Sequence, residues 1–463
     1  MFSGKDLAPE TLPVGAGRPV RAKRVRPAER DREPRRSAFI KTFREVRARG
    51  PQCGIMPRMV IRNISGGVCA AQGFRAAGVP ARIKYEGRND VALLVADAPC
   101  AAAAVFTTNA VAAAPVVYDR AAVKGGRVQA ILANSGCANA CTGAAGLRDA
   151  ELAALATAGE LGLDPRHVLV ASTGVIGRRL PMDRLLAGMK AAAAALARSE
   201  AAGLAAEKAV MTTDTKPKEA AVQTTIGGKT VTVGGMCKGS GMIEPNMATM
   251  LGFLTTDAAV SPAMLRRALR RAVAVSFNHV VVDGDESTND SVFLLASGAA
   301  GNAPIDRAGP DFEAFAEALT AVGVALAKQM AADGEGATKY VEVRVVHAKS
   351  RRDAERAARA IAKSPLAKTS WFGKDPNWGR VLAAAGYSGA AVDDRAAEVF
   401  YGRTWAYRKG EVADAAQLAR LAKEMEGPEL VVTVDLHLGD FSSSIYTCDF
   451  SLDYVHINAD YTT

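Results

Sequence analysis

One hydroxyl in this sequence, that of Thr249, lies in a setting that suits nucleophilic chemistry. It belongs to the segment 238–257, KGSGMIEPNMATMLGFLTTD, in which a cationic, glycine-rich loop leads into a short apolar run. The run from Met250 to Leu254 is typical of a buried strand. A hydroxyl next to a small residue, here Ala248, can attack the adjoining peptide when a local amine or base activates it. Taken alone, Thr249 also fits a hydroxyl that is hydrogen-bonded inside a strand edge.

The remaining residues do not suggest metal, redox or triad chemistry. The seven cysteines are odd in number and lack zinc-ligand spacing, which favours free thiols in a reducing cytoplasm. The glycine-rich segments match neither the dinucleotide pattern nor the Walker pattern. The histidines form no HxH or HExxH pair, so we predict no metal site and no cofactor; they are His167, His279, His347, His437 and His456.

Apolar periodicity predicts a mixed α/β protein. The predicted strands are Val91–Ala96, Val128–Leu132, Val168–Ala171, His279–Asp283, Ser291–Ala296, Lys339–His347, Glu429–Leu436 and Ser443–Phe450, with a hairpin over Ala220–Thr225 and Lys229–Val233. The predicted helices are Asp149–Leu161, Met182–Met211, Pro262–Val275, Asp311–Ala332, Ala354–Lys363 and Asp414–Glu426.

The net charge of +10 does not indicate a nucleic-acid-binding surface. Residues 1–50 contain 14 Lys/Arg and 6 Asp/Glu, so most of the excess lies in one Arg- and Pro-rich leader. We expect this leader to be disordered because it lacks apolar periodicity. The apolar runs are too short to cross a bilayer, and the start of the chain shows no secretory signal. A cytoplasmic protein that binds neither membrane nor nucleic acid is therefore expected.

A series of motifs resembles the ornithine acetyltransferase family, the arginine-biosynthesis enzymes also called glutamate N-acetyltransferases. The segment around Thr249 is similar to the family's self-cleavage motif, and the other motifs follow in the family's order over residues 66–463. They are GGVCAAQGFR from Gly66, FTTN from Phe106, NSGCANACTG from Asn134, STGVIG from Ser172, MTTDT from Met211, STND from Ser287, GEGATK from Gly334, GKDPNWGR from Gly373 and HINADYTT from His456.

The resemblance implies a layered αββα-type sandwich of a self-cleaving enzyme with an N-terminal nucleophile. It places the main acetyltransferase domain at 66–335 and a smaller α/β domain at 336–463. Residues 1–65 have no family counterpart, and Met56 and Met59 precede the first motif. An upstream misreading of the start codon is thus an alternative to a genuine leader.

The resemblance also assigns roles to residues. The precursor would cut itself between Ala248 and Thr249, whose freed α-amine, with a pKa of about 7.7–8.0 in a model peptide, would then take the proton of its own hydroxyl. Thr173 and Gly174 match the oxyanion hole. The substrate-binding positions are Thr212, Lys238, Thr249, Glu335, Asn458 and Thr463. From the residues alone, Thr173 also fits a helix N-cap, Lys238 a solvated lysine and Glu335 a loop carboxylate.

The implied reaction moves an acetyl group from N2-acetyl-L-ornithine to L-glutamate through acetyl-Thr249. Because one amide is exchanged for another, the reaction needs no ATP or redox cofactor. Acetyl-CoA remains open as a second donor, and the family's α2β2 assembly is expected by resemblance only. Two other classes stay as alternatives: a related aminopeptidase with water as acceptor, and an uncleaved binding or assembly protein.

Overall fold

The computed structural model describes residues 60–244 and 250–460, and its larger sheet has nine strands. Their order is β1-β6-β7-β8-β9-β3-β4-β5, with β2 paired to β3. The pairs β8·β9 and β4·β5 are parallel, and the other pairs of this sheet are antiparallel. The bounds are β1 Arg62–Ile64, β2 Phe74–Val79, β3 Val91–Phe106, β4 Arg127–Asn134, β5 Val168–Ser172, β6 Glu219–Ile226, β7 Lys229–Lys238, β8 Leu251–Thr256 and β9 Ser291–Ala296.

The long strand β3 belongs to two halves of this sheet. Its first part, Val91–Val95, pairs with β4 and β2, whereas its last part, Ala101–Phe106, pairs with β9. The register shifts between Val95 and Cys100, where residues 97–99 are exposed. A register shift of this kind bends a strand and increases its twist. The chain therefore passes from one half of the sheet to the other within a single strand.

The two halves share an apolar core between them. Leu94 and Ile131 come from the half around β4, and Met236 and Phe253 from the half around β7, yet all lie in one buried cluster. The rings of Phe253 and Phe293 stack within it at 5.6 Å. Because burial of apolar surface stabilises a fold by roughly 25 cal/mol per Å², this layer is a main source of stability for the sandwich.

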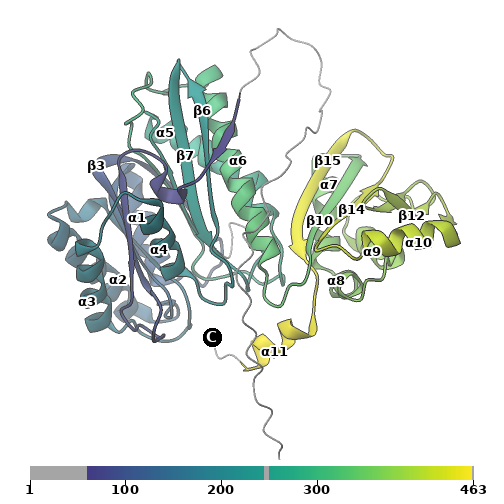
Figure 1. Cartoon of the computed structure of the whole chain (residues 1–463), viewed down its shortest axis with the longest axis horizontal. Coiled ribbons are helices and arrows are strands. Elements are labelled where there is room, and N and C mark those ends of the chain that lie inside the picture. The colour runs from purple at the N-terminus through teal and green to yellow at the C-terminus, as the bar shows by residue number, and fades with distance from the viewer. Residues whose placement is uncertain (1–59, 245–249, 461–463) are drawn as a thin grey trace, which may run out of the picture. The chain divides into compact units, whose positions relative to one another are not determined.

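Helices cover the outward face of each half (Figure 1). Buried side chains of α2 (Gly143–Leu161) and α3 (Met182–Ala194) pack on β3, β4 and β5, while those of α5 (Pro262–Val275) and α6 (Pro310–Ala332) pack on β7, β8 and β9. The helices α1 (Ala114–Ala122) and α4 (Glu200–Val210) complete this part of the chain. The order helix, sheet, sheet, helix confirms the predicted αββα sandwich.

A six-stranded sheet follows, with its own apolar cluster. Its order is β13-β12-β11-β14-β10-β15, and β10 and β14 run parallel. The strands are β10 Tyr340–Ala348, β11 Glu398–Tyr401, β12 Thr404–Arg408, β13 Glu411–Val412, β14 Glu429–Asp435 and β15 Phe441–Cys448. The helices are α7 Arg351–Lys363, α8 Pro365–Phe372, α9 Trp378–Tyr387, α10 Ala415–Glu424 and α11 Leu452–Asp460. The domain boundaries at 66–335 and 336–463 stay a prediction.

Two predicted elements were wrong. The single helix expected over Met182–Met211 is interrupted after Ala194, because the Ser199 side chain accepts a hydrogen bond from the Ala202 N–H (3.1 Å) and so starts a second helix. The strand expected over His279–Asp283 is a 3-10 turn followed by a single bridge, Val280 to Tyr446. Its apolar run is buried and makes single backbone hydrogen bonds, from Val281 to the Tyr446 carbonyl (2.8 Å) and from Val282 to the Ile243 carbonyl (2.7 Å), instead of a continuous ladder.

Among the helices of the described ranges, none combines the length and the apolar composition that a bilayer crossing requires. The six cysteines within those ranges are free thiols, which agrees with the expectation from their spacing. The leader, residues 1–59, lies outside the described residues.

Candidate active site

Three neighbouring strands of the larger sheet bring Lys238, Leu251 and Ser291 together at one end of that sheet. Lys238 ends β7 and pairs with Leu251, the first residue of β8. Leu251 in turn pairs with Ser291, the first residue of β9. Thr249 itself lies outside the described residues, as do Ala248 and Thr463. The chain re-enters at Met250, whose carbonyl accepts the Ser291 N–H at 3.0 Å.

A buried carboxylate, Asp214, connects two of the predicted substrate-binding residues. Its Oδ2 accepts the backbone N–H of Thr212 at 3.0 Å and lies 4.0 Å from the Lys238 ammonium. Its Oδ1 accepts the Gly239 N–H at 2.7 Å and the Lys218 ammonium at 2.8 Å. Lys238 is thus a buried, paired cation, and the alternative of a solvated lysine is wrong.

Buried charges around Asp214 balance one another. Burial alone would raise the pKa of Asp214, but the ammonium groups of Lys238 and Lys218 and the hydrogen bonds hold that pKa well below its usual value. Burial would likewise lower the pKa of Lys218, and Asp214 and Asp333 raise it instead. Lys218 contacts Asp333 at 2.6 Å. Asp214 and Lys218 therefore stay ionised around neutral pH.

The loop after β7 joins this network to a second carboxylate, Glu335. The Ser240 hydroxyl donates to the Asp333 carbonyl at 2.7 Å, and the Glu335 N–H donates to the Ser240 carbonyl at 3.0 Å. A Cβ at Gly241 would lie 2.3 Å from the Glu335 carboxyl carbon, so a side chain there would displace that carboxylate. The loops that carry Lys238 and Glu335 are thus in direct contact.

Helix α11 supplies a partner for Glu335 from near the end of the chain. The Asn458 amide donates to the Glu335 carboxylate at 2.8 Å. The Ser451 hydroxyl donates to the Gly336 carbonyl at 2.6 Å, and a Cβ at Gly336 would lie 2.4 Å from the Tyr454 nitrogen. Close packing at Gly336 therefore holds α11 where Asn458 reaches Glu335.

The predicted oxyanion-hole residues follow the end of β5, on the other half of the sheet. The Thr173 N–H donates to the Asn134 carbonyl at 3.0 Å, and Gly174 has φ +126°. A Cβ at Gly174 would lie 2.5 Å from the Gly136 carbonyl carbon. The next helix, α3, begins only at Met182, so Thr173 is no helix N-cap. Its own N–H is therefore already paired, and that of Gly174 is the backbone donor to consider for an oxyanion.

Asn289 and Asp290, just before β9, connect the two halves of the site. The Asn289 amide donates to the Ser172 carbonyl at 2.8 Å and to the Ala138 carbonyl at 2.7 Å. The Asp290 carboxyl is hydrogen-bonded by the Met250 backbone, one residue after Thr249. These adjacent residues thus reach the oxyanion loop on one side and the start of β8 on the other.

Burial favours the protonated form of Asp290. Complete burial raises its pKa well above the usual value, although hydrogen bonds from Met250 and Ser287 and the charge of Lys238 oppose that rise. A protonated carboxyl can donate a hydrogen bond as well as accept one. Burial thus favours a neutral acid beside Met250, the residue that follows Thr249 in the sequence.

Sequence reasoning assigned no role to Asp214, Lys218, Asp333, Asn289 or Asp290. Two of the quoted motifs contain three of these residues, namely MTTDT with Asp214 and STND with Asn289 and Asp290. In each of these motifs a single acidic residue stands among neutral neighbours, and this pattern could have indicated a buried, functional carboxyl group. Their partners lie up to 151 residues away in the sequence, which no local pattern discloses.

Comparison with known proteins decides the family. The sequence model of the ArgJ family matches residues 75–463, which is most of the chain. The chain belongs to the ArgJ family. A similar protein, the arginine biosynthesis bifunctional protein ArgJ of Symbiobacterium thermophilum, is 54% identical over 404 residues, covering 86% of this chain and 99% of the relative.

Other ArgJ relatives carry different names. The glutamate N-acetyltransferase of Methanothermobacter thermautotrophicus is 46% identical over 421 residues, covering 88% of this chain and 100% of the relative. The crystal structure of ornithine acetyltransferase complexed with ornithine, from Mycobacterium tuberculosis, is 43% identical with a TM-score of 0.38, covering 40% of this chain and 99% of that one. Membership of the ArgJ family makes an acyltransferase of arginine biosynthesis the activity to test.

Proposed function

We propose that this ArgJ family member is a glutamate N-acetyltransferase that moves the acetyl group of N2-acetyl-L-ornithine to L-glutamate. The observation that carries the proposal is the pair of opposite charges, Lys238 and Glu335, on two loops joined through Ser240. Lys238 suits the carboxylate of an amino-acid substrate, and Glu335 suits the ammonium of ornithine. Thr212, Asn458 and Thr463 complete the proposed substrate-binding set.

The proposed transfer has two steps. The Thr249 hydroxyl attacks the acetyl carbonyl, the amide C–N bond breaks, and ornithine leaves with the proton that the threonine lost. The amine of glutamate then attacks the acetyl-threonine ester, forming N-acetylglutamate and restoring the hydroxyl. Both steps build negative charge on the carbonyl oxygen, and the proposed oxyanion hole of Thr173 and Gly174 stabilises that charge, with the Gly174 N–H as its backbone donor.

The same threonine is the proposed agent of maturation. Attack of its hydroxyl on the Ala248 carbonyl breaks the amide bond and gives an ester with a free Thr249 α-amine, and hydrolysis of that ester restores the hydroxyl and separates the two fragments. One residue then supplies both the nucleophile and the base. We include an α2β2 assembly of the two fragments and a cytoplasmic location in the proposal.

A Thr249→Ala variant tests maturation and transfer together. The wild-type protein should give two fragments on a denaturing gel, the smaller beginning at Thr249, and the variant should give one intact, inactive chain. Wild-type protein mixed with N-acetylornithine and quenched in acid should gain one acetyl mass at Thr249. A variant that still splits at this bond, or intersecting rather than parallel double-reciprocal lines for the wild type, would contradict the proposal.

A cationic cavity supports acetyl-CoA as a second acetyl donor. A cavity of about 360 Å³ is lined by four cationic residues and by Phe106. The cationic residues are Arg120, Lys124, Arg266 and Arg270. Polyphosphate groups are the anions that such a cluster attracts. The cavity adjoins the site, because the residue after Phe106 donates its N–H to the Asp290 carbonyl at 2.9 Å.

Replacing arginines of this cavity by alanine tests whether acetyl-CoA is a second acetyl donor. The double variant Arg266→Ala/Arg270→Ala should raise the KM for acetyl-CoA and leave that for N-acetylornithine unchanged. Arg267→Ala is the matched control, since Arg267 lies on the same helix, outside the cavity, over the Phe312 ring. A wild-type protein that does not acetylate glutamate from acetyl-CoA rules this donor out.

A further inference from the structure

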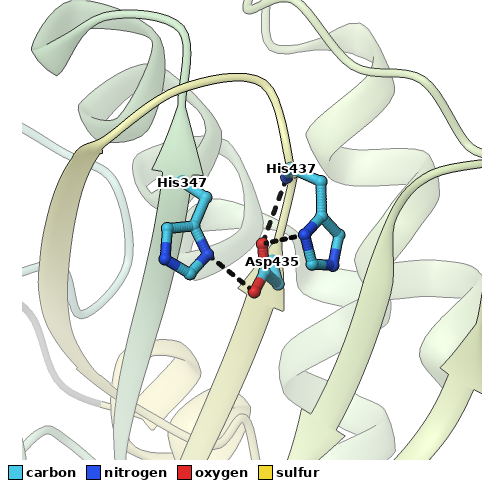
Figure 2. A group of neighbouring side chains, drawn as sticks. All are labelled: His347, Asp435 and His437. Carbon is cyan, nitrogen blue, oxygen red and sulfur yellow. Dashed lines mark hydrogen bonds and ion pairs between the residues drawn. The ribbon is translucent and has the colours of Figure 1, made fainter.

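Two histidines and a carboxylate meet at one edge of the six-stranded sheet, away from the residues discussed so far. Asp435 ends β14, and His347 lies near the end of β10, the strand parallel to it. His437 follows Asp435 by two residues. Figure 2 shows both imidazoles turned toward the carboxylate, with His347 Nδ1 2.8 Å from Oδ2 and His437 Nδ1 3.5 Å from Oδ1.

Both histidines adopt a backbone conformation that is rare for residues other than glycine. Each has φ +51°. A residue in the left-handed region costs about 1 kcal/mol or more, and such outliers concentrate at functional positions. Backbone bonds fix the arrangement, because the His347 carbonyl accepts the N–H groups of Leu438 (2.7 Å) and Gly439 (3.0 Å). His347 and His437 thus both have an unfavourable backbone conformation, and the imidazole of each faces the Asp435 carboxylate.

The three side chains offer a donor set that transition metals prefer. One ligand atom from each lies within 4.8 Å of the others, close enough to share a single ion. Two imidazole nitrogens and one carboxylate oxygen suit Zn²⁺, which keeps a fourth position for water when the protein supplies three ligands. The two rings lie 6.0 Å apart and 20° from parallel, so they flank the carboxylate from either side.

The surroundings add a carboxylate on the outer side of His437. Glu398 Oε1 lies 3.5 Å from His437 Nε2, and Glu398 also faces Arg408 at 3.3 Å and Lys409 at 3.9 Å. A carboxylate on the distal nitrogen orients a ligating imidazole and raises its basicity. Arg408 and Lys409 contact this outer carboxylate.

We propose that His347, Asp435 and His437 bind one divalent transition-metal ion, with zinc the best match. The ion would fasten the chain after β14 to the end of β10. This site goes beyond the proposed acetyl transfer, shares no residue with it, and stands or falls independently of it. Its ligands are partly exposed, so an ion reaches them without opening the fold.

Titration of the full-length protein with Co²⁺ and Zn²⁺ tests the site. Protein stripped with chelator should take up one Co²⁺ with visible d–d absorption, and Zn²⁺ should displace it and raise the Tm. Cys141 is an exposed thiol, so the titration is done on a Cys141→Ser background. Absence of stoichiometric Co²⁺ uptake by that protein would overturn the proposal.

Single variants locate the ion. His347→Ala, His437→Ala and Asp435→Asn should each weaken Zn²⁺ binding by at least about 10-fold and remove the Tm shift. His456→Ala is the matched control, being an exposed histidine on α11, and should bind as the parent does. Far-UV circular dichroism verifies that each variant is folded. Binding that survives all three substitutions, or falls equally in the His456 control, places the ion elsewhere and contradicts the assignment.

Discussion

On one side of the candidate active site Lys238, Lys218 and Asp214 carry buried charges, whereas on the other side Ser172 and Asn134 hold the Gly174 loop with neutral hydrogen bonds. The charged side contains two short ion pairs to Lys218, at 2.6 and 2.8 Å. On the neutral side, the Ser172 hydroxyl donates to the Asn134 side chain at 2.7 Å. Charges recognise charged substrates in both the ground and the transition state, while a backbone donor rewards the charge that develops during reaction. Under the proposed roles, the charged side serves substrate binding and the neutral side serves rate acceleration.

Removing Asp214 should have the largest effect. The variant Asp214→Ala removes the carboxylate that lies 4.0 Å from the buried Lys238 ammonium and leaves Lys218 with Asp333, so we expect a loss of about 3–5 kcal/mol in the free energy of unfolding. Urea denaturation measures that loss. Asp393→Asn, which removes an exposed partner of Arg395, is the control and should leave the midpoint unchanged. Equal midpoints for Asp214→Ala and the wild type would show that the charged side contributes no stability.

A methyl group on the neutral side should instead reduce the rate. In Gly174→Ala the new Cβ meets the Gly136 carbonyl carbon and displaces the loop, so we expect kcat to fall by about 10²- to 10³-fold with little change in KM. Gly177→Ala is the control, because Gly177 also has a positive φ (+80°) but its Cβ would meet no atom within 4 Å. If both variants lose the same activity, backbone strain rather than the displaced donor is responsible.

The partner of Glu335 should affect substrate binding alone. Asn458→Ala removes a hydrogen bond to a carboxylate at a partly exposed position, so KM should rise by about 10-fold while kcat is retained. Steady-state kinetics with N-acetylornithine measure both constants. Val455→Ala, an exposed change on the same helix, should leave them unchanged. A fall in kcat with unchanged KM would assign Asn458 to the reaction step instead.

The smallest effect on activity is expected for Asp290→Asn, since an amide replaces a carboxyl whose neutral form is favoured by burial. Its folded-state pKa is raised above the unfolded value, so the folded protein holds a proton that the unfolded chain has released. The stability tied to that proton is present at low pH and is lost as the pH rises through the raised pKa. The variant should therefore gain stability relative to the wild type with rising pH. Parallel stability curves over that range would mean that Asp290 is ionised in the folded protein.

The sequence allowed us to predict several site residues near strand ends, but not the buried carboxyl groups that connect those residues. Lys238 and Glu335 were assigned to substrate binding by the resemblance of their motifs to the ornithine acetyltransferase family, because the residues alone also fitted a solvated lysine and a loop carboxylate. Asp214 and Asp290 were not assigned roles, because their importance depends on burial and on partners that only the folded chain brings close. The break at Ser199 was missed for a related reason, since high alanine content outweighed a single capping residue. Thr249 lies outside the described residues, so its role stays a prediction.

The bend in β3 carries a consequence for how this family can change over evolution. Val91 at one end of β3 pairs with Asn134, beside the oxyanion loop, and Phe106 at the other end pairs with Ser291, beside Asp290. A single strand therefore contacts both sides of the site, and its length sets the distance between them. Deleting a single residue from 97–99 would shift one half of the strand by one position and turn its inward side chains outward. Surface loops usually tolerate insertions and deletions, but we expect them to be very rare at residues 97–99, although these residues are exposed.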